Sequence, residues 1–253
     1  MAPPIYIYNI MVTGYEIWIG GYFHMSGGIR ALHVLRDELV KRGMNAWMKY
    51  ERHDPQAIGI YPEIVADNPE GYEHVTRWLL NTADLTDDPT WAWEAGMGTD
   101  RLLTVNTIEL DLFKPAGKLR HDTAFWVGKG EKDERFIPDH CVEIHRGNYP
   151  SRESVAELLQ SVRYLISFDP FSAMNLEALL CGTPVLIRGH HPRMTRKQII
   201  DHGWTPFGVA FSMEELEDAQ REVHLARDHY LSLLPVFDQR VDGFITETLR
   251  LYQ

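Results

Sequence analysis

The stretch SFDPFSAMNLEALLCGTPVLI, residues 167–187, places two acids in a strand–helix–strand pattern. Asp169 ends the first strand-like segment, and Glu177 follows in the early part of the helix-like segment. Open α/β sheets bind their ligands at the carboxyl ends of their strands, so Asp169 is expected at such an edge. A helix that begins near Ser172 would point free backbone N–H groups and a positive dipole end at the same edge, which suits a phosphate.

A purely structural explanation fits the same spacing. Asp169 would then cap the start of the helix, and Glu177 would lie on its solvated face, because most acids in α/β proteins are structural or solvated. An acid beside a phosphate site would instead bind hydroxyls, such as those of a ribose or a hexose. The spacing alone leaves both explanations open.

Strand-like and helix-like segments alternate on both sides of this stretch, judged by β-branched and aromatic runs and by helical apolar spacing. Strands are predicted at residues 4–11, 15–20, 45–50, 57–61, 101–106, 123–128, 141–145, 163–168, 184–187 and 208–211. Helices are predicted at residues 26–43, 71–81, 151–162, 172–182, 195–203 and 212–234, with a last helix after an interruption at Pro235. Gly43 is a natural helix stop, Ser151 a natural N-cap, and Ser212 with Glu215 a capping box.

A polar segment at residues 113–122 contains Pro and Gly, has no periodicity, and separates two sets of alternating elements. Two such sets predict an α/β chain with two doubly wound, Rossmann-like domains. The predicted domains are residues 1–115 and 116–253, and the last helix is a candidate to pack back on the first domain.

The acid pair and the residues after it resemble the donor-site signature of glycosyltransferases with the GT-B fold, especially those similar to glycosyltransferase family 4. That family carries E-x₇-E followed by an EA…G.PV phrase. The corresponding residues here are Asp169, then after seven residues Glu177, Ala178, Gly182, Thr183, Pro184 and Val185. The resemblance covers most of the chain loosely and residues 123–187 best. Asp169 departs from the pattern because it is one methylene shorter than Glu.

The resemblance implies a compact GT-B-like enzyme with its active site in the cleft between two domains. It implies hexosyl transfer from a nucleotide-diphosphate sugar, UDP-linked, to an acceptor hydroxyl, with retention of anomeric configuration. The first domain, expected to be trimmed, would face the acceptor, and the second would bind the donor. Asp169 would position the donor sugar without acting as a nucleophile, and Glu177 would hold the ribose.

A second motif, GGYFHMSGGIRALHVL at residues 20–35, joins a strand to a helix through a Gly-rich turn. Gly27 and Gly28 would let the backbone approach a pyrophosphate, and Arg30 in the first helical turn would reach a phosphate. His24 is a candidate to contact the donor sugar or the acceptor hydroxyl, although a lone loop histidine often does neither. The motif is neither a dinucleotide fingerprint nor a Walker loop, and a plain tight turn is its structural explanation.

A third motif, FWVGKGEKDERF at residues 125–136, carries basic residues after a predicted strand. In the family that the chain resembles, a basic residue at this place holds the diphosphate. Lys129 is the candidate, with Lys132 and Arg135 as substitutes, and its charge would stabilise the leaving nucleoside diphosphate. A solvated lysine in a charge-rich loop is the structural alternative.

The sequence gives little support for a metal site or another cofactor. Glu109 and Asp111 are the nearest approach to a D-x-D pair, and they stand in a strand-like context. His190 and His191 lack the spacing of a metal-binding pair and have no cysteine nearby. We therefore expect a metal-independent enzyme whose only co-substrate is the nucleotide sugar.

Composition and charge argue against a duplex-DNA-binding, a membrane-spanning or a secreted protein. The chain has 253 residues and a net charge of −11, with no basic footprint in bulk for duplex DNA. No apolar run approaches the length of a membrane span, no signal peptide is evident, and two distant cysteines, Cys141 and Cys181, suggest a reducing compartment. A cytoplasmic protein is expected.

Two rival functions remain at this point. One is a phage-type glycosyltransferase that acts on modified DNA bases, for which the four fixed positive charges within residues 188–197 are the only support. The other is a non-catalytic protein that binds a nucleotide sugar. The sequence names neither the sugar, the acceptor nor the oligomeric state.

Overall fold

The computed structural model describes residues 12–20, 26–81, 83–84, 86–145, 147–149, 151–190, 195–201 and 205–252. The chain divides into two compact units. The first contains Gly28–Asn106, residues 12–20 and the C-terminal segment from Pro235, and the second contains Thr107–Leu234 with residues 26–27. The strand predicted at residues 4–11 lies outside the described residues. Among the residues described, no helix has the length and apolar character that a membrane crossing requires.

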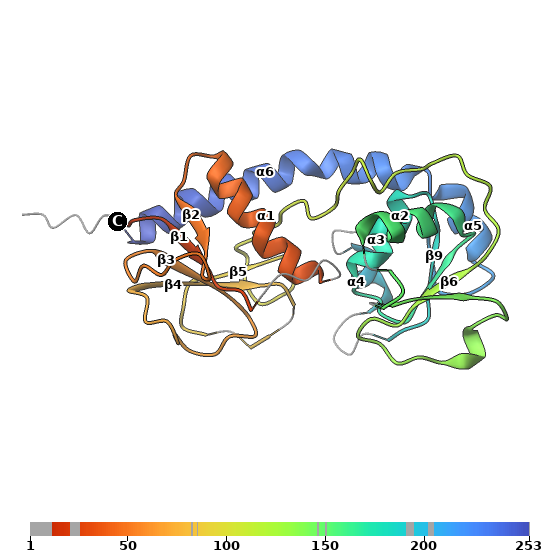
Figure 1. Cartoon of the computed structure of the whole chain (residues 1–253), viewed down its shortest axis with the longest axis horizontal. Helices are drawn as coiled ribbons and strands as arrows, with labels where there is room; N and C mark the ends of the chain where they lie inside the picture. Colours follow the sequence, from red (N-terminus) through yellow and green to blue (C-terminus); the bar gives the residue numbers. More distant parts are fainter. Residues whose placement is uncertain are drawn as a thin grey trace, which may run out of the picture. The chain divides into compact units, whose positions relative to one another are not determined.

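The first unit contains five parallel strands in the order β2-β1-β3-β4-β5 (Figure 1). Its elements are β1 (Tyr15–Ile17), α1 (Gly27–Lys41), β2 (Ala46–Met48), β3 (Ile58–Pro62), β4 (His74–Leu79), β5 (Thr90–Ala92) and the later part of α6 (Leu225–Tyr252). The predicted stop at Gly43 is confirmed, because α1 ends at Lys41 and Gly43 has a φ of 80°.

The second unit also contains five parallel strands, in the order β10-β9-β8-β6-β7. Its strands are β6 (Ala124–Trp126), β7 (Val142–Ile144), β8 (Leu165–Ser167), β9 (Val185–Ile187) and β10 (Val209–Ala210). Its helices are η1 (Glu134–Phe136), α2 (Arg152–Ser161), α3 (Ala173–Leu180), α4 (Arg196–Asp201), α5 (Leu216–Glu222) and the start of α6. Figure 1 shows α2 and α3 on one side of these strands and α5 on the other.

Counted within its own unit, each sheet has the strand order 2-1-3-4-5, an order of doubly wound Rossmann-like folds. This confirms the prediction of an α/β chain with two parallel sheets. In such sheets the chain reverses its direction of winding between two neighbouring strands, and ligands bind at the carboxyl ends of those strands. The reversal lies between β1 and β3 in the first sheet and between β6 and β8 in the second.

Several predicted elements are wrong. Within the helix predicted at residues 71–81, His74–Leu79 form strand β4 instead, because Val75, Thr76 and Trp78 pair with β3 and Trp78 also pairs with β5. Residues 101–106 form no strand beyond a single bridge between Leu102 and Ala92. The apolar spacing of residues 71–81 fits a helix equally well, so only the pairing partners decide the outcome.

The C-terminal helices also differ from the prediction. The capping box at Ser212 is absent, because α5 begins at Leu216 and Glu215 makes no side-chain cap. Pro235 does not interrupt a helix but lies inside the 28-residue α6. Proline removes one backbone hydrogen bond, yet the later turns are retained because Val241 and Phe244 pack into the core of the first unit.

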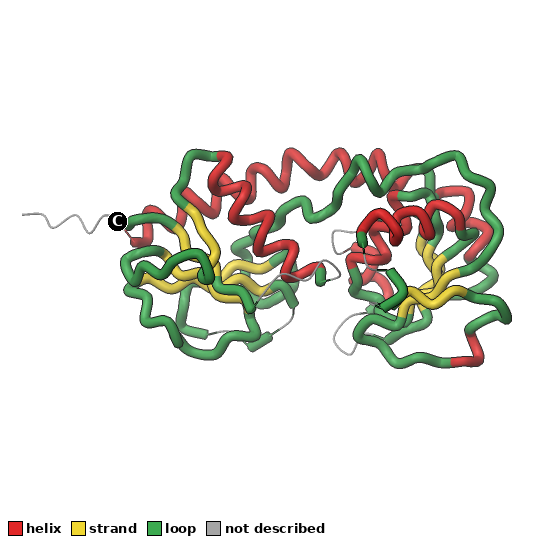
Figure 2. Tube along the Cα trace, in the orientation of Figure 1, coloured by secondary structure: helices red, strands yellow, loops and turns green. Residues whose placement is uncertain are grey.

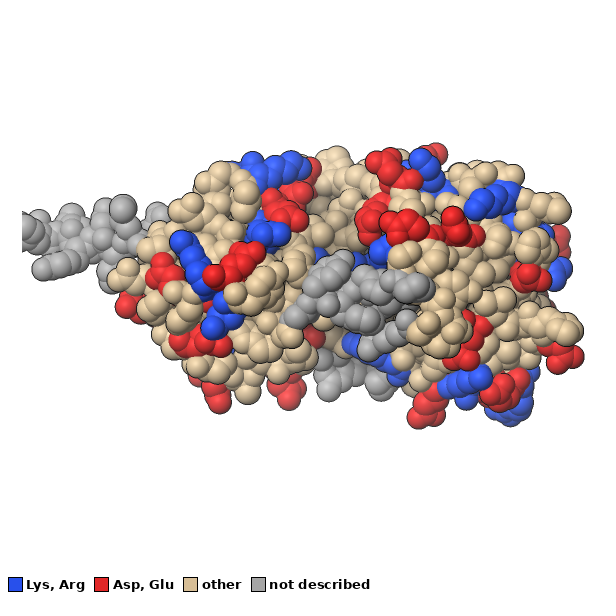
Figure 3. All heavy atoms as spheres, in the orientation of Figure 1, with Lys and Arg blue, Asp and Glu red and all other residues tan. Residues whose placement is uncertain are grey.

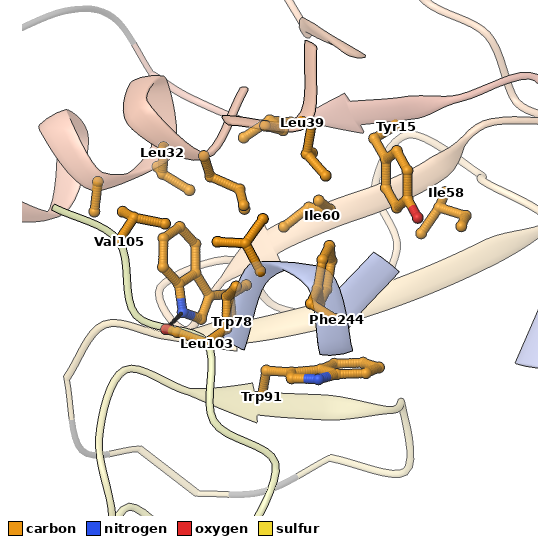
Figure 4. Close-up of a cluster of buried hydrophobic side chains, with 14 of the residues drawn as sticks. Tyr15, Leu32, Leu39, Ile58, Ile60, Trp78, Trp91, Leu103, Val105 and Phe244 are labelled. Carbon is orange, nitrogen blue, oxygen red and sulfur yellow. Dashed lines mark hydrogen bonds between the residues drawn. The ribbon is translucent and has the colours of Figure 1, made fainter. Parts of the chain in front are cut away.

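One face of the first sheet is covered by α1 and α6 (Figure 4). Tyr15 and Ile17 of β1 point into a cluster with leucines of α1 and with Phe244 of α6. The rings of Trp91 and Phe244 meet edge to face with centroids 5.1 Å apart. Burial of these large side chains supplies the main stabilisation of the unit, because hydrophobic stabilisation scales with the apolar area removed from water.

The opposite face of the first sheet is covered by loops instead of helices, since both described helices of this unit pack on the Tyr15 side (Figure 2). Glu16 of β1 lies on this face and is fully buried. Its carboxylate accepts hydrogen bonds from Trp47 Nε1 at 3.1 Å, from the Asp54 backbone N–H at 2.7 Å and from the Tyr72 hydroxyl at 2.6 Å, with His53 Nδ1 at 3.1 Å. The buried Glu16 carboxylate therefore holds the loops on this face against the sheet through its hydrogen bonds.

Gly59, which pairs with Glu16 on the neighbouring strand, makes room for the Tyr72 ring. A Cβ at Gly59 would lie 2.1 Å from the Tyr72 ring. We therefore expect Gly59→Ala to displace the ring, weaken the Tyr72–Glu16 hydrogen bond and lower the free energy of unfolding by about 1–3 kcal/mol. Urea denaturation measures the change.

The matched control is Gly243→Ala in α6, where a Cβ would meet nothing within 4 Å. This control should raise the free energy of unfolding by about 0.5–1 kcal/mol, because alanine is the better helix residue. Equal effects of the two variants would show that Gly59 is not needed for the Tyr72 packing.

Glu94 follows β5 and is 5% exposed. Burial raises the pKa of its carboxyl to about 8, against the opposing charge of Arg240 on α6. The folded state therefore binds more protons than the unfolded chain between about pH 4.5 and 8, and its free energy of unfolding falls as the pH rises through this window. The effect is on the order of a few kcal/mol.

Glu94→Gln removes this titration. We expect the free energy of unfolding of the variant, relative to the wild type, to rise between pH 5 and pH 9, as measured by urea denaturation at each pH. Glu73→Gln, at an exposed glutamate of the same unit, is the matched control. A constant difference between Glu94→Gln and the wild type across this range would contradict the prediction.

Candidate functional site

The candidate site lies where winding reverses in the second sheet, between β6 and β8. The loop after β6 carries Lys129, and the loop after β8 carries Asp169. Because β6 and β8 are parallel neighbours, these loops meet at the same edge of the sheet. The Lys129 backbone N–H donates to Asp169 Oδ2 at 3.0 Å.

Asp169 is held by four hydrogen bonds and is 8% exposed. Its carboxylate accepts from the Lys129 backbone at Oδ2 and from the Phe171 backbone at Oδ1, the latter at 3.2 Å. Its carbonyl oxygen accepts from Ser167 Oγ and from Asn175 Nδ2, both at 2.9 Å. Asp169 is not the helix cap, because Ser172 has that role.

Three glycines allow the surrounding loops to approach this strand end. A Cβ at Gly128, whose φ is 57°, would lie 2.4 Å from Asp169 Oδ2. A Cβ at Gly130 or at Gly189 would lie 1.8 Å from the Phe168 carbonyl oxygen. Only glycine fits at such distances. The sequence analysis did not single out these glycines, although the alternation Gly-Lys-Gly at residues 128–130 is a signal for the first two.

Ser172 caps the N-terminus of α3. Its Oγ accepts hydrogen bonds from the Met174 backbone at 3.3 Å and from Trp126 Nε1 at 2.9 Å. A hydroxyl has two acceptor lone pairs and one donor, so these two bonds leave the Ser172 proton available for donation. The hydroxyl and the helix N-terminus together favour an anionic partner.

Among the three candidate cations, Lys129 differs from its substitutes. Lys132 pairs with Glu134 at 2.9 Å, and Arg135 pairs with Asp133 at 2.6 Å. Lys129 is exposed, and no carboxylate in the described part of the chain forms an ion pair with it. Its charge is therefore available to a ligand at the end of β6.

Glu177 is 1% exposed, so the solvated-face explanation of this residue is wrong. Its two carboxylate oxygens accept from the Arg152 guanidinium at 2.9 Å each, across the interface between α2 and α3. Arg152 also donates to Glu109 at 3.1 Å and lies 4.3 Å from the centroid of the Phe113 ring. Sequence reasoning did not find this pairing, because Arg152 is 25 residues from Glu177.

The remaining predicted residues lie at or just before the N-terminus of α1. Gly27 and Gly28 open this helix, and a Cβ at Gly28 would make ordinary contact with Leu80 at 3.5 Å. Arg30 lies in the first turn and is 5% exposed. His24 lies outside the described residues. Gly28 and Arg30 belong to the first unit, whereas Asp169 belongs to the second.

Metal ligands and reactive thiols are not gathered at this site. Within the described ranges, no three His, Cys, Asp or Glu side chains are placed to share a metal ion. Burial raises the pKa of Cys141 to about 11 and that of Cys181 to about 12, so both thiols stay protonated at neutral pH. On the face shown in Figure 3, acidic and basic described residues are interspersed.

A scan of protein-family models finds no match to the chain. A comparison with curated proteins finds no match either.

The buried pair of Arg152 and Glu177 allows a test of its structural role. Glu177→Leu should lower the free energy of unfolding by about 3–5 kcal/mol, because it leaves a buried guanidinium without this carboxylate. The double variant Arg152→Met with Glu177→Leu should recover much of the loss, since both charges are removed. Urea denaturation measures both.

The control is Glu109→Gln, because the Glu109 side chain is 54% exposed. Exposed ion pairs contribute little, so this change should cost less than about 1 kcal/mol. If the double variant were no more stable than Glu177→Leu, the unpaired Arg152 guanidinium would not be the cause of the loss of stability.

Proposed function

We propose that the protein is a glycosyltransferase that moves a hexose from a nucleotide-diphosphate sugar, UDP-linked, to an acceptor hydroxyl. One observation carries the proposal: Lys129, Asp169 and the N-terminus of α3 gather where winding reverses in the second sheet. A cation and hydrogen-bond donors at such an edge suit a diphosphate, and a carboxylate beside them suits sugar hydroxyls.

The diphosphate would bind between Lys129 and the start of α3. The Ser172 hydroxyl has a proton to donate, and the positive end of the α3 dipole adds to its attraction for an anion. As the bond from the anomeric carbon to the diphosphate oxygen breaks, negative charge grows on the leaving group. Donors already fixed in place stabilise this charge without reorganising.

The sugar would bind beside Asp169. Among the described residues, each carboxylate oxygen accepts one backbone hydrogen bond, which leaves a lone pair for a sugar hydroxyl. The four hydrogen bonds hold the group still, which favours a role in orienting the sugar. Retention of configuration follows only from the resemblance of the acid pair to family 4 enzymes.

The proposal extends to a GT-B-like arrangement in which the turn before α1 completes the donor site from a cleft. Gly27, Gly28 and Arg30 would then approach the diphosphate, and His24 would contact the sugar or the acceptor. The proposed contact between Glu177 and the ribose requires a rearrangement of the site. The Glu177 carboxylate is buried against Arg152 and has to become accessible before it can bind a nucleotide.

A thermal-shift screen tests the proposal, with UDP-glucose, UDP-galactose, UDP-N-acetylglucosamine and GDP-mannose beside UDP and GDP. A ligand at 100 times its dissociation constant adds about 2.7 kcal/mol to the free energy of unfolding, which is visible as a raised melting temperature. No shift with any of these compounds overturns the proposal. Binding without hydrolysis or transfer to any sugar acceptor would indicate a non-catalytic nucleotide-sugar binder.

Lys129→Ala should weaken UDP binding about 10-fold, because it removes one charge-assisted contact to the diphosphate. Isothermal titration calorimetry measures the change. Lys132→Ala is the matched control in the same loop, since its ammonium already pairs with Glu134, and it should change affinity less than about 2-fold. Equal losses in both variants would mean that the loop acts only through its general positive charge.

Transfer activity should persist in the presence of EDTA. The proposed mechanism assigns charge stabilisation to Lys129, Ser172 and the helix N-terminus, which act without a divalent cation. Product formation with and without EDTA is the measurement, and untreated enzyme in the same buffer is the control. Activity that is lost in EDTA and restored by Mn²⁺ or Mg²⁺ would refute a metal-independent mechanism.

A further inference from the structure

Asn175 lies in the first turn of α3 and is 6% exposed. Its Nδ2 donates to the Asp169 carbonyl oxygen at 2.9 Å, so the side chain turns back toward the end of β8. Its Oδ1 is buried and accepts no hydrogen bond from any residue that the structure describes. Buried polar atoms nearly always have a partner, so this oxygen requires an explanation.

A structural role of Asn175 explains the hydrogen bond of its Nδ2 but not the burial of its Oδ1. The Asp169 carbonyl oxygen already accepts a second hydrogen bond, from Ser167 Oγ at 2.9 Å. Holding that carbonyl uses the Asn175 Nδ2 and leaves Oδ1 desolvated without compensation. An apolar side chain of the same shape would avoid the desolvation, so Oδ1 points to a ligand that supplies a donor.

The polar groups at this site fall into two chemical kinds. Lys129 and the Ser172 hydroxyl are donors and match the oxygens of a diphosphate. The lone pairs of Asp169 and Asn175 Oδ1 are acceptors, which a diphosphate cannot satisfy. Acceptors match the part of the ligand that carries hydroxyl or amide protons.

We infer that Asn175 Oδ1 accepts a hydrogen bond from a hydroxyl or amide N–H of the transferred sugar. The inference rests on the proposed function and adds a residue that distinguishes the sugar from the nucleotide. Asn175 then has two roles. Its Nδ2 positions Asp169, and its Oδ1 binds the donor sugar.

Two variants separate these roles. Asn175→Leu keeps the approximate shape and removes both polar atoms. Ser167→Ala removes the other donor to the same Asp169 carbonyl and leaves the carboxamide in place. Isothermal titration calorimetry compares both with the wild type, using UDP and GDP and the four nucleotide sugars of the thermal-shift screen.

Asn175→Leu should weaken the nucleotide sugar that the wild type binds by about 3- to 12-fold, the value of one neutral hydrogen bond. It should change the affinity for the parent diphosphate less than about 2-fold. Ser167→Ala should not reproduce this difference between sugar nucleotide and diphosphate. Wild-type affinity in Asn175→Leu, or an equal loss for both ligands, overturns the inference and leaves the proposed function standing.

Absence of binding by the wild type to any of the six compounds overturns the proposed function itself. A crystal structure of the wild-type complex decides the inference if Asn175→Leu does not fold. A sugar hydroxyl or amide nitrogen within hydrogen-bond distance of Asn175 Oδ1 supports it. An Oδ1 surrounded by carbon atoms, or bonded only to the nucleotide, overturns it.

Discussion

Four hydrogen bonds onto Asp169 hold the carboxyl end of β8 in one geometry, and the candidate site depends on them. Two of these bonds come from backbone N–H groups, one of them on the loop that carries Lys129. The position of the cation is therefore set by the acid. Gly128 and Gly130 make the approach possible, since any side chain there would collide with the strand end. A single aspartate thus orders groups from β6, β8 and α3.

In the first unit another buried acid, Glu16, holds loops against the sheet. Its sheet has the same strand order, but loops take the place of helices on one face. On that face Tyr61, Val65 and Tyr72 form a small buried cluster, and hydrogen bonds help to tie the loops to the sheet. Glu16 does so by accepting from Trp47, Tyr72 and the backbone of Asp54. Burial and the hydrogen bond to Glu16 both raise the pKa of Tyr72, which keeps its hydroxyl protonated as the donor.

Glu177 belongs to the acid motif, but in the structure it forms a buried ion pair that stabilises the packing of α3 on α2. The acid pair that resembles a donor signature consists here of one residue at the sheet edge and one buried in a bidentate ion pair with Arg152. The pair fixes α3 against α2 and thereby the direction in which the N-terminus of α3 points. Glu177 thereby helps to place Ser172 and Asn175. Substitutions at Glu177 therefore need a stability measurement beside any binding measurement.

The sequence by itself determined the α/β class, the two parallel sets of strands and helices, the N-cap at Ser151 and the helix stop at Gly43, because these depend on local periodicity and backbone preference. It also indicated that Asp169 ends a strand. Tertiary structure alone decided that His74–Leu79 form strand β4, that α6 continues through Pro235, and that Glu177 pairs with Arg152. These outcomes depend on partners far away in the chain, for which local spacing carries no signal. The hydrogen bonds on Asp169 and the buried Oδ1 of Asn175 likewise exist only once β6, β8 and α3 meet.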